Sequence, residues 1–588
     1  MKKMLGICAA LAGVSALAAP LSEMPLPPQE KSCWKLTNYE NKLKIEQGKV
    51  FEGAPCLYIG GSTSKVDTAW YATSKELPIA AGAQSFRLRF KAYSERRVYD
   101  TTVAKVGWNN SIFWYDADGK ELKVESLTHA YPRGDFSEIT VTGPVWKGAA
   151  KAVVQLGFDM PNIPPGEKFA LRDCTFALLA EPCAEQSVTE KVVPLPMPDL
   201  PKRTFTVDRL PDTPRATLRD DGITLIDGKP FFPIGAYSVA RREFNGNDLD
   251  RAFKDLKAAG FNFAHTYGNS YDPEFLAAAR KYGFKLWVQA RWPDRNLLEV
   301  GRFDPSILAW YLGDDTADYE TPWETRGYHD AVKSVDPTRL TCQADPIGSG
   351  RRVTRYSDFV TATDVFMPEI YPVRGGLGDP TDTNCVAQTI LDMQAVRRDV
   401  ATYNDGQPRA CWPIIQFFKG WGGWKHFPTR DQIYAMSFAS IIHGAHGITW
   451  YTYGGYFDKR YNDTNEGMNS TPGRWKDMSE LATWIAELSP ALVERTGAQP
   501  PPAEILAGPQ KDPFGKNPSV TALLKRHGDE TYLLTVNAAP ERVRARFVLA
   551  DVPASATVMR ENRTIATANG ALEDDFAPFA VHIYRWVK

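Results

Sequence analysis

The sequence predicts a multidomain protein with a central (β/α)8 TIM barrel, flanked by an N-terminal β-sandwich of jelly-roll type and a small C-terminal β-sandwich. Three observations indicate this fold class: 588 residues exceed a single domain, both ends alternate with a period of two, and strands alternate with helices between them. The predicted boundaries are 1–18 for a signal peptide, 30–185 for the first sandwich, 186–215 for a Pro-rich linker, 216–498 for the barrel and 500–588 for the second sandwich.

The N-terminal region shows half-buried strands. Phe86, Leu88, Phe90 and Ala92 alternate with polar residues, and Ala152 to Phe158 repeats the pattern. Many short strands without a convincing helix favour an antiparallel sandwich. Four cysteines here (Cys33, Cys56, Cys174 and Cys183) allow two disulfides, with three possible pairings, although small buried hydrophobic residues are the favoured interpretation.

The barrel prediction rests on repeated helix and strand signals. Gly260 and Gly283 each end a helix immediately before a Phe that opens a strand. Asp272 caps a helix that has Pro273 in its first position, and Thr429-x-x-Gln432 is a capping box. The eight expected strands are 231–237, 261–267, 284–290, 307–312, 339–343, 365–371, 412–418 and 447–453.

A doubly wound sheet is the alternative for this region. That fold would want a Gly-rich phosphate turn after the first strand, and Tyr237-Ser238-Val239-Ala240 is not one. Eight strands over about 280 residues suit a barrel better.

The N-terminus has the pattern of a signal peptide, whereas the C-terminal region has the pattern of β-strands. Met1-Lys2-Lys3, an apolar run and Ala16-Leu17-Ala18 have the form of a cleavable signal peptide, which predicts a secreted or periplasmic protein without a membrane span. The tail returns to a period of two at Val543, Ala545 and Phe547, and nothing in it suggests chemistry.

The charge balance and the sequence motifs narrow the classes of molecule that the protein is expected to bind. Lys+Arg 69 against Asp+Glu 70 leaves a net charge of -1, which argues against nucleic-acid binding. No metal and no cofactor are expected. His443 and His446 fall at a helix end on the face of the barrel opposite the expected site, where cap hydrogen bonding is favoured over a metal pair. The segment Gly420-Trp421-Gly422-Gly423-Trp424 lacks the glycine spacing of a dinucleotide-binding motif. The oligomeric state is left open.

Reactive residues of a barrel project from the carboxyl ends of its strands. There, Asp314, Asp315 and Glu369 are the candidate catalytic carboxylates, since glycosidic cleavage needs two carboxyl groups beside the bond. Adjacent strand residues point to opposite faces, so one of the two aspartates is expected to face the pocket centre. Rings and polar groups on the same rim suit a sugar, and these are His265, Tyr267, Trp292, Tyr371, Gln416, Trp421, Trp424 and Trp450.

Two stretches carry a family resemblance: Trp310-Tyr311-Leu312-Gly313-Asp314-Asp315 and Gly447-Ile448-Thr449-Trp450-Tyr451. With the three-part plan they resemble clan A glycoside hydrolases, most of all barrels related to families two, five and forty-two, and the N-terminal region is similar to galactose-binding-like jelly rolls of carbohydrate-binding modules. The resemblance covers nearly half the chain. It implies that Asp315 takes the place of the acid/base glutamate and that Trp450 lies beneath the bound sugar.

Two departures accompany the resemblance. The acid position holds Asp rather than Glu, and Gln416 stands where the clan places its nucleophilic glutamate. The predicted function is therefore an exported glycoside hydrolase acting on a carbohydrate, with Asp315 as general acid and Glu369 as nucleophile or base. The alternatives are a non-catalytic glycan-binding protein on a degenerate barrel and, less favoured, a polysaccharide lyase.

Overall fold

A computed structural model of the chain describes most of its length. The described residues are 19–38, 43–60, 66–94, 108–130, 136–163, 166, 168–183, 186–190, 215–239, 248–266, 272–290, 295–316, 322–346, 357–375, 380–402, 405–420, 423–458, 463–550 and 552–587. The expected signal peptide, 1–18, lies outside them. Within these ranges, no helix has both the length and the hydropathy needed to span a bilayer.

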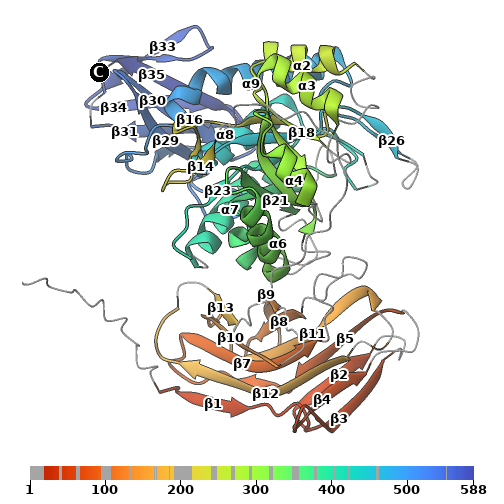
Figure 1. Ribbon diagram of the computed structural model, residues 1–588. Helices are drawn as coiled ribbons and strands as arrows, with labels where there is room; N and C mark the ends of the chain where they lie inside the picture. The colour runs from red at the N-terminus through yellow and green to blue at the C-terminus, as the bar shows by residue number, and fades with distance from the viewer. Residues whose placement is uncertain are drawn as a thin grey trace, which may run out of the picture. The chain divides into compact units, whose positions relative to one another are not determined.

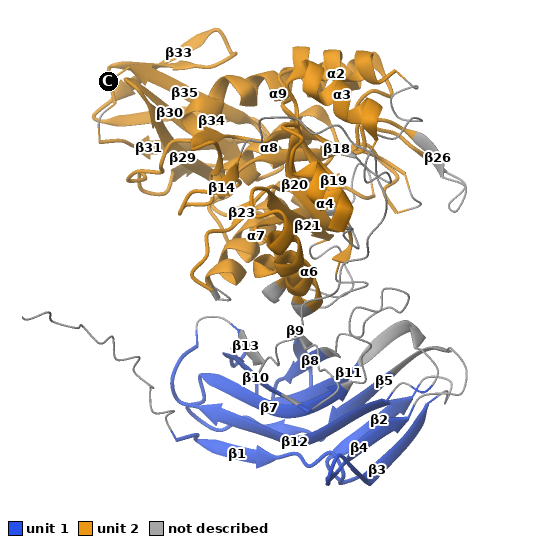
Figure 2. Ribbon diagram, viewed as in Figure 1, with its two compact units in different colours: residues 1–97, 106–193 blue, residues 98–105, 194–588 orange. Residues whose placement is uncertain are grey.

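The chain divides into two compact units (Figure 2). The first consists of Met1–Arg97 and Val106–Val193, and the second of Val98–Lys105 and Pro194–Lys588. The barrel and the C-terminal sandwich thus form one unit.

The first unit is a sandwich of two antiparallel sheets, ordered β13-β10-β7-β12-β4-β3, with β1 on β12, and β2-β5-β11-β8-β9, with β6 on β11. Its core holds Phe86, Leu88 and Phe90 of β7, as the alternation predicts. The sandwich begins before residue 30 and continues past 185, because β1 and β13 add strands to its first sheet. Its strands are β1 Ser22–Pro25, β2 Trp34–Asn38, β3 Lys44–Phe51, β4 Ala54–Gly60, β5 Val66–Ser74, β6 Leu77–Pro78, β7 Ser85–Ser94, β8 Trp108–Tyr115, β9 Glu121–Ala130, β10 Ser137–Pro144, β11 Lys151–Ile163, β12 Lys168–Leu179 and β13 Ser187–Glu190.

The described cysteines are all free thiols. Three of the four in the sandwich, Cys33, Cys56 and Cys174, are buried, as are the three in the barrel. The interpretation of these residues as small buried hydrophobic groups is confirmed for the six buried cysteines.

The second unit contains the predicted barrel (Figure 1). Its parallel strands are ordered β21-β20-β19-β18-β17-β25-β24-β22, and pairing of β21 with β22 closes the ring. The seventh strand is in two segments, β23 and β24, because Pro413 between them has no N–H to donate to the ladder. The barrel strands are β17 Ile234–Ala236, β18 Phe263–Thr266, β19 Lys285–Gln289, β20 Ile307–Gly313, β21 Leu340–Pro346, β22 Val365–Ile370, β23 Ala410–Cys411, β24 Ile414–Gln416 and β25 Ile448–Tyr451.

Helices and short hairpins complete the barrel. Asp272 caps α3 through the N–H groups of Glu274 and Phe275, and the capping box of Thr429 and Gln432 opens α8, so both cap predictions are confirmed. His443 is the C-cap of α8, in agreement with a capping role. The remaining elements are α2 Leu249–Ala258, α3 Pro273–Tyr282, α4 Arg295–Gly301, α6 Pro322–Val335, η2 Ser357–Thr361, α7 Pro380–Thr402, α8 Arg430–Ile442, α9 Pro472–Leu492, β14 Ala216–Leu218, β15 Thr224–Ile226, β16 Lys229–Phe231, β26 Tyr456–Asp458 and β27 Asp463–Asn465.

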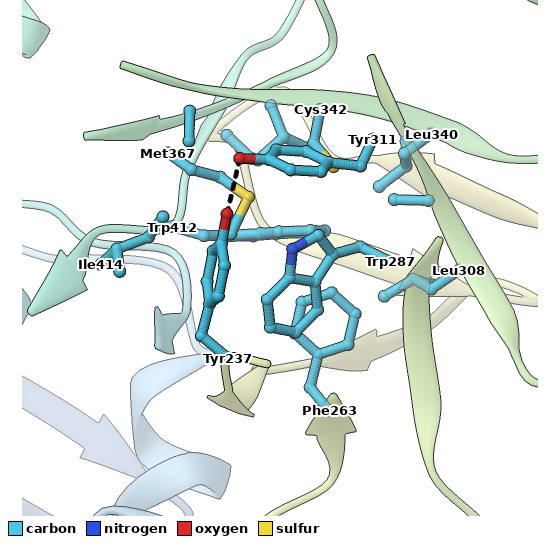
Figure 3. Packing of buried hydrophobic residues seen from close by; sticks show 14 of the residues in the cluster. Tyr237, Phe263, Trp287, Leu308, Tyr311, Leu340, Cys342, Met367, Trp412 and Ile414 are labelled. Carbon is cyan, nitrogen blue, oxygen red and sulfur yellow. Dashed lines mark hydrogen bonds between the residues drawn. The ribbon is translucent and has the colours of Figure 1, made fainter. Parts of the chain in front are cut away.

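The barrel interior is filled with large side chains (Figure 3). Phe263 lies 4.3 Å from Trp287 and 5.1 Å from Trp412 between ring centroids, and all three are fully buried. Tyr237 and Tyr311 cover this layer, and their hydroxyls are 2.9 Å apart. Because the interior is packed, chemistry is confined to the rim above these tyrosines.

The C-terminal region is an antiparallel sandwich with the strand order β28-β31-β34-β33-β32-β35-β30-β29. Its core includes Phe547, Phe576 and Tyr584. The sandwich packs on α8 and α9, where Nε2 of His443 lies 3.2 Å from the hydroxyl of Thr521. Its strands are β28 Glu504–Ala507, β29 Val520–His527, β30 Glu530–Asn537, β31 Val543–Val548, β32 Ser555–Val558, β33 Arg563–Ala568, β34 Ala571–Phe576 and β35 Val581–Val587.

Candidate active site

The carboxyl ends of β20, β21 and β22 bring four carboxyl groups to one part of the barrel rim. Asp314 and Asp315 directly follow β20, Asp345 lies near the end of β21, and Glu369 lies near the end of β22. Register places Asp345 opposite Pro368, one residue before Glu369. The structure therefore gathers the three predicted catalytic carboxylates and adds a fourth.

Asp314 is held by two tyrosine hydroxyls. Tyr237, after β17, donates to Oδ1 of Asp314 at 2.8 Å, and Tyr311, within β20, donates to the same oxygen at 2.7 Å. Both tyrosines are almost fully buried. Two hydroxyl donors on one carboxyl oxygen fix the orientation of the Asp314 side chain.

The backbone turns sharply at Asp315. Its φ is 50°, in the left-handed region that a non-glycine residue adopts at a cost of about 1–3 kcal/mol. Because β20 ends at Gly313, the alternation of a strand no longer governs the two aspartates. The negative charges of both Asp314 and Asp315 act on Glu369 and Tyr371. That one of the two aspartates faces the pocket centre stays a prediction.

The pKa of Glu369 is shifted by its surroundings. Burial is the largest cause that raises the pKa of Glu369 well above its ordinary value. The negative charges of Asp315, Asp314 and Asp345 raise this pKa further, and so does a hydrogen bond with Asp314. Glu369 therefore keeps its proton at pH values where a glutamate in water has lost it.

Asp345 is not among the predicted site residues. It is buried, and its Oδ2 accepts a hydrogen bond from Nε2 of Gln343 at 2.9 Å. The sequence could have revealed Asp345 through its place, before Pro346, at the end of the fifth strand, because a carboxylate at the carboxyl end of a barrel strand lies at the rim.

His265 lies below the rim. Its side chain is fully buried, stacked on Trp287 with 4.9 Å between centroids and 4.2 Å from Tyr237. Burial lowers the pKa of His265 well below its ordinary value, so the ring is neutral. The prediction that His265 binds sugar hydroxyls is corrected, because the ring has no exposed surface.

Gln416 has a structural task. Its Oε1 accepts from the N–H of Val373 at 2.9 Å, and its Nε2 donates to the carbonyl oxygens of Val373 at 2.8 Å and Phe418 at 3.3 Å. The side chain is fully buried. An amide suits this position because it both donates and accepts, and the predicted substrate contact by Gln416 is corrected for the same reason.

Trp450 faces away from the barrel interior. Its indole N–H donates to the hydroxyl of Ser437 on α8 at 3.0 Å, and its ring packs on Phe261 with 5.8 Å between centroids. Trp450 is fully buried, so the prediction that it lies beneath a bound sugar is wrong. Its neighbour Tyr451 is the residue of β25 that faces inward, 5.1 Å from Tyr237 between centroids.

Tyr371 and Trp424 form the aromatic side of the rim. The indole N–H of Trp424 donates to the carbonyl oxygen of Tyr371 at 3.0 Å, and the two rings meet edge to face with 6.2 Å between centroids. The guanidinium of Arg374 lies 4.9 Å from the centre of the Trp424 ring. Trp424 is partly exposed and Tyr371 is buried. The other predicted ring contacts, Tyr267, Trp292 and Trp421, lie outside the described residues.

No protein-family model and no curated protein matches this sequence. Among solved structures the chain is similar to an alpha-amylase from Anoxybacillus, with 11% identity and a TM-score of 0.41, over 60% of this chain and 98% of that one. A beta-galacturonidase from Eisenbergiella tayi has 11% identity and a TM-score of 0.36, over 77% and 97% of the two chains. A beta-glucuronidase from Ruminococcus gnavus has 10% identity and a TM-score of 0.35, over 77% and 98%.

These similarities are similarities of fold. The predicted architecture, a closed eight-stranded parallel barrel with antiparallel sandwiches on both sides in sequence, is confirmed by the strand pairing itself.

Proposed function

We propose that this protein is a glycoside hydrolase in which Glu369 is the proton donor and Asp315 is the partner carboxylate. The observation that carries the proposal is the gathering of Glu369, whose pKa is raised, with Asp314, Asp315 and Asp345 at the carboxyl end of a barrel. Cleavage of a glycosidic bond uses one carboxyl group that donates a proton and a second one that attacks the sugar or activates water.

The roles follow from what each group already bonds. Oδ1 of Asp314 is occupied by the hydroxyls of Tyr237 and Tyr311, so Asp314 is a positioning residue that keeps negative charge beside Glu369. Asp315 is the reacting carboxylate in this scheme. Glu369 gives its proton to the glycosidic oxygen as the bond to the anomeric carbon breaks, and Asp315 either attacks that carbon or takes a proton from the attacking water.

This assignment exchanges the roles that the sequence suggests, with Asp315 as the acid and Glu369 as the nucleophile or base. That expectation follows the position of Asp315 in the resemblance. A carboxyl group whose pKa is raised by desolvation and by negative neighbours is a poor nucleophile, because it stays protonated and neutral. The same environment is what a general acid requires.

The substrate class follows from the reaction, and we propose a carbohydrate chain as the partner. Trp424, which is partly exposed and packs edge to face on the buried Tyr371, supplies aromatic surface at this rim, which suits the apolar face of a sugar ring. We also propose that the protein is exported, on the form of residues 1–18. Sequencing the N-terminus of the protein recovered from outside the cytoplasm tests this point.

One observation favours a second function. Gln416, at the strand where clan A barrels carry a nucleophile, is committed to the backbone of Val373. A barrel that has lost hydrolysis and retains glycan binding accounts for that residue equally well.

The two functions are separated by one screen. The full-length protein is incubated with a panel of polysaccharides, and both bound protein and newly formed reducing ends are measured. The hydrolase predicts release that Glu369→Gln and Asp315→Asn abolish while binding persists. Binding without release by the unsubstituted protein supports the glycan-binding function instead.

A further inference from the structure

A cavity of about 650 Å³ lies at the amino ends of the barrel strands, the side opposite the proposed active site. It is enclosed by α7, α8, the turn between β14 and β15, the segment after α9, and β29 of the C-terminal sandwich. Both parts of the second unit thus contribute to its wall. The side chains of interest are cationic: Arg397, Arg409, Arg495 and Lys525.

Lys525 reaches the cavity from β29 and is only 6% exposed. Its ammonium donates to the carbonyl oxygen of Glu494 at 2.5 Å and to the hydroxyl of Thr496 at 3.0 Å. Among the described residues no carboxylate lies within ion-pair distance of this ammonium. Lysine is almost never buried without a charged partner, and Lys525 has no direct ion-pair partner in the described part of the chain.

Two arginines add to this unbalanced charge. Arg397 of α7 packs against Gly444, since a Cβ atom added at Gly444 would lie 3.1 Å from Cδ of Arg397. No carboxylate among the described residues pairs with this arginine. Arg409 donates from Nη2 to Asp405 at 2.6 Å, while its buried Nε–H finds no acceptor among the described residues. Lys525 and Arg397 therefore have unused capacity to bind an anion in the cavity, beside the guanidinium of Arg409.

The acidic residues of the same wall are already engaged. Asp220 pairs with Arg495 at 2.6 Å, Asp221 pairs with Arg219 at 2.7 Å, and the carboxylate of Glu494 lies 3.1 Å from Nδ1 of His527. None of these carboxylates forms a direct ion pair with Arg397 or Lys525, and Asp221 and Glu494 act on Lys525 only at longer range.

His446 is a neutral part of the wall. Its Nδ1 accepts the backbone N–H of Cys411 at 3.0 Å, which leaves the proton on Nε2. Burial, helped by the positive charges of Arg397 and Lys525, lowers the pKa of His446 to about 4. His446 therefore offers no positive charge of its own at neutral pH.

We propose that this cavity binds a small anion through a phosphate or carboxylate group, held by Lys525 and Arg397. The ligand would bridge the C-terminal sandwich, which contributes Lys525, and the barrel, which contributes Arg397. The anion site is separate from the carboxylate rim, so the proposal of anion binding does not depend on the proposed hydrolysis.

Anion binding at this site is expected to be coupled to proton uptake by the ammonium of Lys525. Burial is the main cause that lowers the pKa of Lys525 to about 8; Arg219 lowers it further, and the charges of Asp221 and Glu494 oppose the shift. Arg397, Arg495 and the neutral His446 line the same cavity. A bound anion favours the charged ammonium, so binding near pH 8 takes up protons.

Calorimetric titration of the full-length protein with inorganic phosphate, and separately with acetate, tests the proposal in a chloride buffer at pH 7. Binding of either probe identifies which group the site takes. Arg397→Gln and Lys525→Met are each expected to raise the Kd at least about tenfold, a loss of about 1.4 kcal/mol. Lys511→Met, an exposed residue of the same sandwich, is the matched control and should leave the Kd unchanged.

A second titration at pH 8 in two buffers of different ionisation enthalpy measures proton uptake, which Lys525→Met should remove. Absence of binding by both probes overturns the proposal. So does binding that Arg397→Gln leaves unaltered, and because Arg397 is an exposed residue this result does not depend on whether Lys525→Met folds.

Discussion

The hydroxyl of Tyr237 lies 2.8 Å from Oδ1 of Asp314, and Tyr237 reaches that carboxylate from β17, a barrel strand that is not a neighbour of β20. Tyr237 follows the first barrel strand and Asp314 follows the fourth, so the bond spans the top of the packed interior. It fixes a negative charge next to Glu369 and links the barrel core to the chemistry of the rim.

We expect Tyr311→Phe to lower kcat about tenfold while leaving KM nearly unchanged. The substitution removes one hydrogen bond to a charged oxygen, worth about 1.5–3 kcal/mol, without changing the ring that packs in the interior. Steady-state kinetics on a substrate found in the screen measures the effect. Tyr282→Phe, a partly exposed tyrosine on α3, is the control, and an equal fall in kcat there would contradict the role given to Tyr311.

Glu369→Gln should raise the stability of the protein at neutral pH and have little effect near pH 4. The unfolded chain ionises Glu369 above about 4.5, whereas the folded chain holds its proton because its pKa is raised. The folded state then binds more protons than the unfolded state, so stability falls as pH rises through this window. Thermal unfolding of both proteins at the two pH values checks the sign, and a destabilised variant at neutral pH would contradict it.

Gln416→Glu should not create a nucleophile. The change replaces an Nε2 donor by a carboxylate oxygen facing the carbonyl groups of Val373 and Phe418, and it buries a charge. We expect a loss of about 2–5 kcal/mol of stability, seen in chemical unfolding. A gain of hydrolytic activity in this variant would show that the strand-seven position is open to substrate.

Trp450→Ala should cost about 3–5 kcal/mol of stability through the cavity it leaves between β25 and α8. Affinity for glycan should not change in the protein that remains folded at low temperature. Isothermal binding measurements beside the unfolding curve distinguish this result from the loss of affinity that a sugar-stacking tryptophan would show.

Local chemistry explains which parts of the fold the sequence predicts. Asp272-Pro273 and Thr429-x-x-Gln432 act through bonds within a few residues, so the helix starts they predict are found. The carboxylates after the fourth and sixth strands are likewise found together, because parallel strands bring their carboxyl ends to one rim.

Whether a side chain of a barrel strand points into the barrel or away from it could not be predicted in the same way. Trp450 and Tyr451 are both aromatic, and only the register of β25 with its neighbours decides that Tyr451 faces inward. Barrel strands are apolar on both faces, so their sequence carries little signal of direction. The proton on Glu369 is also invisible in sequence, since it depends on the charges of Asp314, Asp315 and Asp345 in space.

The role of Glu369 as proton donor is tested most sharply by the response of Glu369→Gln to the leaving group. Once the screen has identified the sugar, kcat is measured on aryl glycosides whose phenols range from weakly to strongly acidic. A general acid is needed only for poor leaving groups, so the variant should be nearly as fast as the unsubstituted protein on the most acidic phenol and should lose about 10²–10⁴-fold on the least acidic one. An equal loss on every substrate would contradict the assignment of Glu369 as the proton donor and would favour its action as a nucleophile.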